Sequence, residues 1–96
     1  MPNQVVVFHQ HGCPACSDYL PRFRKIAPKY RAFLNIQIAD LNRAVKKIQD
    51  AAVEYKITSI PTTLVLDAND NVLKRAVGAL PDTQIAKLFE FAAAGK

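Results

Sequence analysis

The chain has 96 residues, a length that suits one domain over residues 1–96. Half of the residues are hydrophobic, which excludes intrinsic disorder, and only three are glycine, which excludes collagen-like structure. Thirteen basic against eight acidic side chains give a formal net charge of +5, and no apolar run approaches the ~18 residues of a membrane helix. The first residues also lack the basic segment and the long apolar run of a secretory signal peptide, so we expect a soluble, cytoplasmic protein. We further expect it to be a monomer that does not bind membranes.

The first half of the chain is predicted to form a strand, a helix and a second strand. Residues 5–8 are β-branched or aromatic without polar alternation, which indicates a strand buried on both faces. Apolar residues recur at three- and four-residue steps over residues 14–30, which is typical of an amphipathic helix. Pro21 should kink this helix because it lacks an intrahelical donor, and Pro28 should weaken its last turn. Residues 34–38 form the second predicted strand.

The second half is predicted to form a helix, two strands and a last helix. Asn42 is the expected N-cap of a helix that continues to about residue 55. Residues 62–66 and 72–77 are separated by turn-forming residues, so we expect a hairpin there. A proline at position 81 suits the first turn of the last helix.

This order of elements, βαβ followed by ββα, determines the expected fold class. The first half implies parallel strands joined by a right-handed crossover, and the second half adds antiparallel strands. Since the strands read as buried on both faces, both faces need helical cover. We therefore expect an α/β domain with a central four-stranded mixed sheet and helices on both of its faces.

Cys13 and Cys16 are the only cysteines, and a bridge between them would close too small a loop to restrain the unfolded chain. The pair is therefore predicted to be reactive or metal-binding. Cys13 follows a strand and opens a helix, where free backbone N–H groups stabilise a thiolate. Cys16 lies one turn inside, on the same face, within reach of the Cys13 sulfur. The two provide a nucleophile and a resolving thiol for thiol–disulfide exchange.

Two histidines near the cysteines allow further interpretations. His9, His11, Cys13 and Cys16 have the ligand types that zinc accepts, but their separation is far shorter than in zinc fingers, so we expect no metal. His9 is either a partly buried strand residue bonded to backbone or a proton acceptor near the dithiol, since an ordinary pKa near 6.5 suits that role. His11 is expected to be an exposed loop residue.

The charge is concentrated in residues 1–48, which carry eight basic and two acidic side chains. Such a surface could serve acidic partners or nucleic acid. No nucleic-acid motif or aromatic platform accompanies the charges, so we interpret them as a solvated helix face and do not expect nucleic-acid binding.

Four segments, taken in order, resemble the thioredoxin family. They are the redox motif Cys13-Pro14-Ala15-Cys16, the proline Pro21 five residues later, the segment Tyr55-Lys56-Ile57-Thr58-Ser59-Ile60-Pro61-Thr62, and Val77-Gly78-Ala79-Leu80. The match extends over nearly the whole chain from residue 5. It implies the thioredoxin fold, dithiol oxidoreductase activity without a cofactor, and a cis Ile60–Pro61 bond that faces the dithiol.

The resemblance also implies a substrate-binding edge. The Ile60 backbone would pair with an extended substrate chain, and Gly78 would allow the close approach of that chain. From the residues alone, Pro61 could equally be an ordinary proline before a strand, and Gly78 an ordinary glycine at a strand end.

The chain departs from the family at several positions. Val7 and Ile38 replace the buried aspartate and its lysine partner, which leaves the proton acceptor for Cys16 undetermined. The dipeptide between the cysteines is not Gly-Pro, and we expect Ala15 to offer a backbone N–H near the Cys13 sulfur. The glutaredoxin Gly-Gly signature is absent because Ala79 follows Gly78.

Together these features predict an enzyme that reduces protein disulfides through Cys13 and Cys16. Its expected partners are disulfide-containing proteins and a reductant, either a thioredoxin-reductase-like enzyme or glutathione. Two alternatives stay open, a glutathione-dependent glutaredoxin-like enzyme and a non-catalytic module that uses the fold for binding or assembly.

Overall fold

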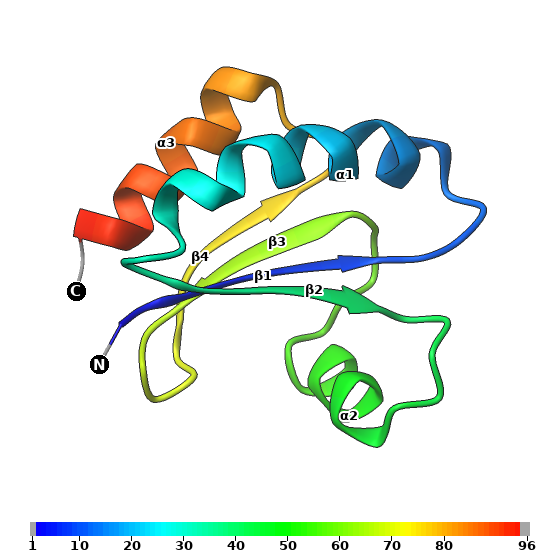
Figure 1. Cartoon of the computed structure of the whole chain (residues 1–96). Helices are drawn as coiled ribbons and strands as arrows, with labels where there is room; N and C mark the ends of the chain where they lie inside the picture. The colour runs from blue at the N-terminus through cyan, green and yellow to red at the C-terminus, as the bar shows by residue number, and fades with distance from the viewer. Residues whose placement is uncertain (1, 95–96) are drawn as a thin grey trace.

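The structure is a computed structural model that describes residues 2–94 of the chain (Figure 1). In chain order its elements are β1 (Gln4–His9), α1 (Pro14–Ile26), the 3-10 helix η1 (Ala27–Tyr30), β2 (Asn35–Asp40), α2 (Lys46–Glu54), β3 (Thr62–Leu66), β4 (Val72–Val77) and α3 (Asp82–Ala94). Gly95, which the sequence predicts to end the last helix, lies outside the described residues. Within residues 2–94, every helix is too short or too polar to traverse a bilayer.

The strands form one mixed sheet in the order β2-β1-β3-β4. β1 runs parallel to β2, and β3 runs antiparallel to both β1 and β4. The predicted four-stranded α/β architecture is therefore confirmed. Because β1 and β2 are parallel, their carboxyl ends meet at one edge, where His9 lies opposite Asp40. The loop that leads into α1 starts at this edge (Figure 1).

Helices cover both faces of the sheet, as the buried strands require (Figure 1). On one face α1 and α3 pack together against β1 and β3, with Val5, Val7, Tyr19, Phe23, Val65, Ile85, Leu88 and Phe89 forming the core. On the other face α2 covers a smaller cluster that includes Val6, Phe8, Ala39, Leu64 and Leu66. α2 contributes only partly buried side chains, so α1, which begins at the cysteine motif, rests on the better packed face.

Two predicted helix boundaries were wrong. The helix predicted over residues 14–30 ends at Ile26 and continues as a 3-10 turn, because Pro28 has no N–H to donate within the last α-helical turn. Asn42 does not cap α2, whose N-cap is Val45 without a side-chain bond. The Asn42 side chain instead accepts a hydrogen bond from the backbone N–H of His11, which lies in the loop between β1 and α1.

Candidate active site

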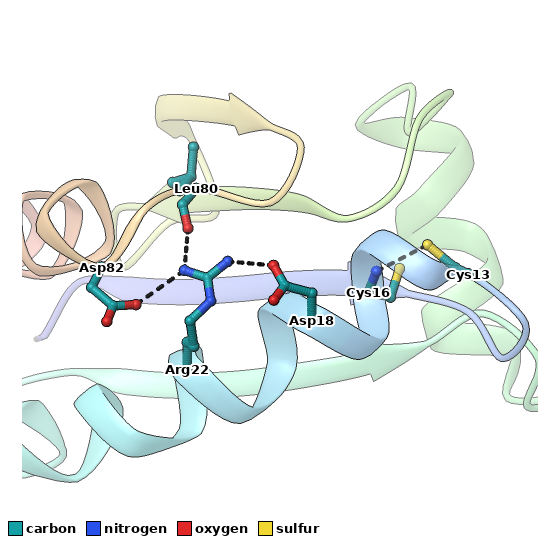
Figure 2. A network of polar contacts seen from close by, with 6 residues as sticks. All are labelled: Cys13, Cys16, Asp18, Arg22, Leu80 and Asp82. Carbon is teal, nitrogen blue, oxygen red and sulfur yellow. Dashed lines mark hydrogen bonds and ion pairs between the residues drawn. The ribbon is translucent and has the colours of Figure 1, made fainter.

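Cys13 is the N-cap residue of α1, with an extended backbone before the helix starts. Its Sγ accepts the backbone N–H of Cys16 at 3.1 Å (Figure 2). Pro14 fills the first helical position, where a missing N–H costs nothing. The sulfur thus lies where the unpaired N–H groups and the helix dipole favour negative charge.

Cys16 lies one turn further and is only 1 % exposed, whereas Cys13 is partly exposed. Both are free thiols in this structure. Burial raises the pKa of the Cys16 thiol, and its contact with Cys13 adds to this effect. Cys16 is therefore a neutral thiol near pH 7 that must lose a proton before it can act as a nucleophile.

A second wall of the site comes from the segments before β3 and after β4. The Ile60–Pro61 bond is cis, as the resemblance implies, and the Ile60 carbonyl lies 3.9 Å from Cys13 Sγ. The Gly78 N–H donates to the Pro61 carbonyl at 2.7 Å. The Ile60 backbone thus lies beside Cys13, and a hydrogen bond joins Gly78 to the neighbouring Pro61.

Glycine is required at position 78 by its backbone conformation and not by space. Its φ is +97°, a region that L side chains rarely adopt, whereas a Cβ built there would meet no atom within 4 Å. The open space next to the Gly78 backbone is available to an approaching chain.

A hollow of about 430 Å³ lies beside Cys16, between α1 and the ends of β1 and β2. We call it the Cys16 hollow. Its lining includes Cys16, His9, Asp40, Arg24 and Arg43. No metal-ligand group of three or more His, Cys, Asp or Glu side chains occurs within residues 2–94.

His9 is the half-buried imidazole of this hollow. Burial lowers the pKa of His9, the carboxylate of Asp40 opposes that shift, and Arg24 and His11 reinforce it. His9 is therefore neutral near pH 7. The Asp40 carboxyl has a lowered pKa, chiefly because it accepts the backbone N–H of Asn42, and it remains ionised.

His11 is exposed, as predicted, but sequence reasoning missed its partner. Its Nε2 lies 3.2 Å from an Asp40 oxygen. The signal was weak because the two residues come from different segments and meet only when β1 and β2 pair in register.

Val7 and Ile38 lie opposite each other in the parallel pair of β1 and β2, as expected of two residues that replace a buried pair of the family. Val7 is fully buried in the core below α1. Neither position offers a proton acceptor, so any protein group that takes the Cys16 proton has to come from elsewhere in the site.

The expectation about Ala15 was wrong. The backbone donor that reaches the Cys13 sulfur is the N–H of Cys16, the third residue of the helix. An N-cap side chain can bond either the second or the third N–H, and here it selects the third. No bond from the Ala15 N–H to this sulfur is present.

Sequence reasoning also missed Arg22. Its guanidinium bonds Asp18 on the same helix, and it also bonds Asp82 and the Leu80 carbonyl, which follow β4 in the chain (Figure 2). The i,i+4 spacing from Asp18 was visible in the sequence. The contacts with Leu80 and Asp82 join segments about sixty positions apart and required the fold.

Comparison with known proteins places these features in a family context. The family described as a thioredoxin-like domain matches residues 2–93. The thioredoxin of Mycoplasma genitalium is 37 % identical over 87 residues, which are 91 % of this chain and 79 % of that protein. The mitochondrial thioredoxin of Mus musculus is 28 % identical over 81 residues, which are 84 % of this chain and 46 % of that protein.

Solved structures show the same fold at low sequence identity. A structure of thioredoxin-2, described as a component of malaria parasite protein secretion machinery, superimposes with a TM-score of 0.78 at 20 % identity and covers 94 % of this chain and 82 % of that chain. StoA from Bacillus subtilis superimposes with a TM-score of 0.74 at 17 % identity, covering 90 % of this chain and 81 % of that chain.

Proposed function

The chain belongs to the thioredoxin-like family, and from that premise we propose that it reduces disulfides of other proteins through Cys13 and Cys16. The observation that carries the proposal is the asymmetry of the pair. Cys13 is partly exposed at a helix start, while Cys16 is buried directly behind it.

In the first step the Cys13 thiolate attacks one sulfur of a substrate disulfide. The substrate S–S bond breaks, a mixed disulfide forms at Cys13, and the released sulfur leaves as a thiolate that takes up a proton. The N–H of Cys16, which bonds the Cys13 sulfur at 3.1 Å, stabilises the attacking charge.

In the second step Cys16 loses its proton and attacks the Cys13 sulfur. The mixed disulfide breaks, the second substrate sulfur leaves and is protonated, and a Cys13–Cys16 disulfide remains. The substrate has gained two electrons and two protons. A thioredoxin-reductase-like enzyme or glutathione then returns the pair to the dithiol.

The Ile60 backbone, Pro61 and Gly78 form the proposed seat of the substrate chain. The Ile60 carbonyl lies beside Cys13 Sγ, and Gly78 has open space above its backbone. An extended peptide bonded to these backbone groups would bring its disulfide to Cys13.

We assign His9 as the acceptor of the Cys16 proton. His9 and Cys16 line the same hollow, which has room for water to connect them. His9 is neutral near pH 7 and can accept a proton, and Asp40 opposite it stabilises the imidazolium that results. This role would replace the acid–base pair that Val7 and Ile38 cannot form.

Replacing His9 with glutamine is expected to slow resolution of the mixed disulfide by about 10²-fold, the lower end of what general bases contribute. In the wild type the resolution rate should fall as the pH drops through the His9 pKa, which lies below its ordinary 6.5, because imidazolium cannot accept a proton. Stopped-flow measurement of product release against pH tests both points. A His9→Gln profile identical to that of the wild type would contradict the assignment.

Limited alkylation at neutral pH is expected to label Cys13 before Cys16, because Cys16 is buried and its pKa is raised. Mass spectrometry of the partly labelled protein locates the modification. Preferential labelling of Cys16 would reverse the two roles.

The reductant is tested by insulin reduction with thioredoxin reductase and NADPH, beside the same reaction with glutathione and its reductase. We expect turnover with the first system. Turnover with glutathione and its reductase, but not with thioredoxin reductase, would favour the glutaredoxin-like alternative. A protein that turns over with neither, while its Cys13→Ser, Cys16→Ser variant keeps its biological role, would be a binding or assembly module.

A further inference from the structure

The connection between β4 and α3, taken together with the first residue of α3 (residues 78–82), forms one side of the proposed substrate seat and is held at two points. At one end the Gly78 N–H bonds the Pro61 carbonyl at 2.7 Å. At the other end the Leu80 carbonyl and the Asp82 side chain accept bonds from the Arg22 guanidinium. Ala79 lies exposed between these points.

Arg22 belongs to the helix that carries the dithiol. Its Nη2 bonds Asp18 at 2.7 Å, and its Nη1 bonds Asp82 at 3.0 Å as well as the Leu80 carbonyl (Figure 2). The guanidinium lies 5.9 Å from the ring centre of Tyr19, which is fully buried. One planar cation therefore connects α1 to the 78–82 segment with bonds in fixed directions.

The strength of this connection comes from its geometry. The Arg22 side chain is 27 % exposed, whereas the two carboxylates are each about two-thirds exposed. A simple surface ion pair contributes little. Here a partly buried guanidinium bonds a backbone carbonyl, so moving the 78–82 segment would break a charge-assisted bond and leave a half-buried cation short of partners.

We propose that Arg22 is a positioning residue that fixes the 78–82 segment relative to Cys13 and thereby sets the affinity for protein substrates. The proposal rests on the function proposed above. A protein substrate needs the Gly78 backbone at a set distance from the dithiol, because an extended chain would have to reach both at once. A small disulfide needs only the Cys13 sulfur.

The test compares Arg22→Met with Lys25→Met, an exposed cation on the same helix. Methionine keeps an unbranched side chain at this position and removes the three bonds that the guanidinium makes. For insulin we expect Arg22→Met to raise KM about 10-fold, because a displaced 78–82 segment weakens binding of the substrate chain, with kcat within about 2-fold of the wild type because the dithiol chemistry is unchanged. Reduction of dithionitrobenzoate, a small aromatic disulfide, and the redox potential of the pair should stay unchanged. Lys25→Met should match the wild type throughout.

Two further variants keep the test decisive if Arg22→Met folds poorly. Arg22→Lys keeps the charge without the planar guanidinium, so its KM for insulin should lie between that of the wild type and that of Arg22→Met. Asp82→Asn keeps the Leu80 bond and should raise KM by less than Arg22→Met. Hydrogen exchange at the Gly78 amide should accelerate in the order of the KM values.

The outcomes separate this inference from the proposed function. Wild-type protein that does not reduce insulin contradicts the function. Wild-type protein that does so, while the Arg22 variants show an unchanged KM for insulin, overturns the role of Arg22 alone. Equal losses for insulin and for the small disulfide would also overturn it, since they would indicate a general effect on the dithiol.

Discussion

Replacing Cys13 with serine is expected to reduce insulin turnover to the uncatalysed background, because a hydroxyl cannot form the mixed disulfide. Serine is a favourable N-cap, so it should keep the bond from the Cys16 N–H and the stability of α1. The free energy of unfolding should therefore change by less than about 0.5 kcal/mol. Turnover and urea unfolding of the same preparation separate loss of chemistry from loss of fold.

The Cys16→Ser variant completes this experiment. It retains the nucleophile and lacks the resolving thiol, so one substrate should remain attached to Cys13 as a mixed disulfide that a reductant releases. Denaturing electrophoresis without reductant measures the adduct. Residual turnover in Cys13→Ser, or an adduct on Cys16 in that variant, would contradict the assignment of roles.

Truncating Phe89 to alanine is expected to cost about 3–5 kcal/mol, a large part of the 5–15 kcal/mol that stabilises a domain. Phe89 is fully buried. Its ring stacks on Tyr30 at 5.2 Å and meets Phe23 at 5.1 Å, so it joins α3 to α1 and η1. A cavity there would loosen the face that supports the cysteine motif.

Phe91→Ala provides the matched control on the same helix. Phe91 is 44 % exposed, and its ring has Lys74 5.1 Å from its centre. Losing that contact should cost less than about 1 kcal/mol. Urea unfolding measures both losses of stability. The slope of the free energy of unfolding against urea concentration should be the same in the variants and the wild type. Equal losses in the two variants would contradict the packing described for this core.

The strands and the order of elements were predictable because their signals are local. The β-branched run of β1 and the two strands of the hairpin coincide closely with the observed β1, β3 and β4. The dithiol position was predictable for the same reason, since a C-x-x-C pair after a strand opens a helix by itself.

The failures involve side chains whose partners come from distant segments. Asn42 has a side chain that suits a helix cap, but in the fold its oxygen accepts the His11 N–H, and α2 begins only at Lys46. The hollow around His9 depends on the register of β1 against β2. Contacts of this kind follow from the assembled sheet and not from propensity.

The central claim, that this dithiol transfers electrons to protein disulfides, is tested most directly by a single-turnover reaction. Reduced protein, freed of other thiols, is mixed with excess insulin, and mass spectrometry follows the Cys13–Cys16 pair while a thiol count follows insulin. We predict that each chain loses two hydrogens as its internal disulfide forms, and that two insulin thiols appear for each chain oxidised. A dithiol that stays reduced while insulin keeps all its disulfides would contradict the claim.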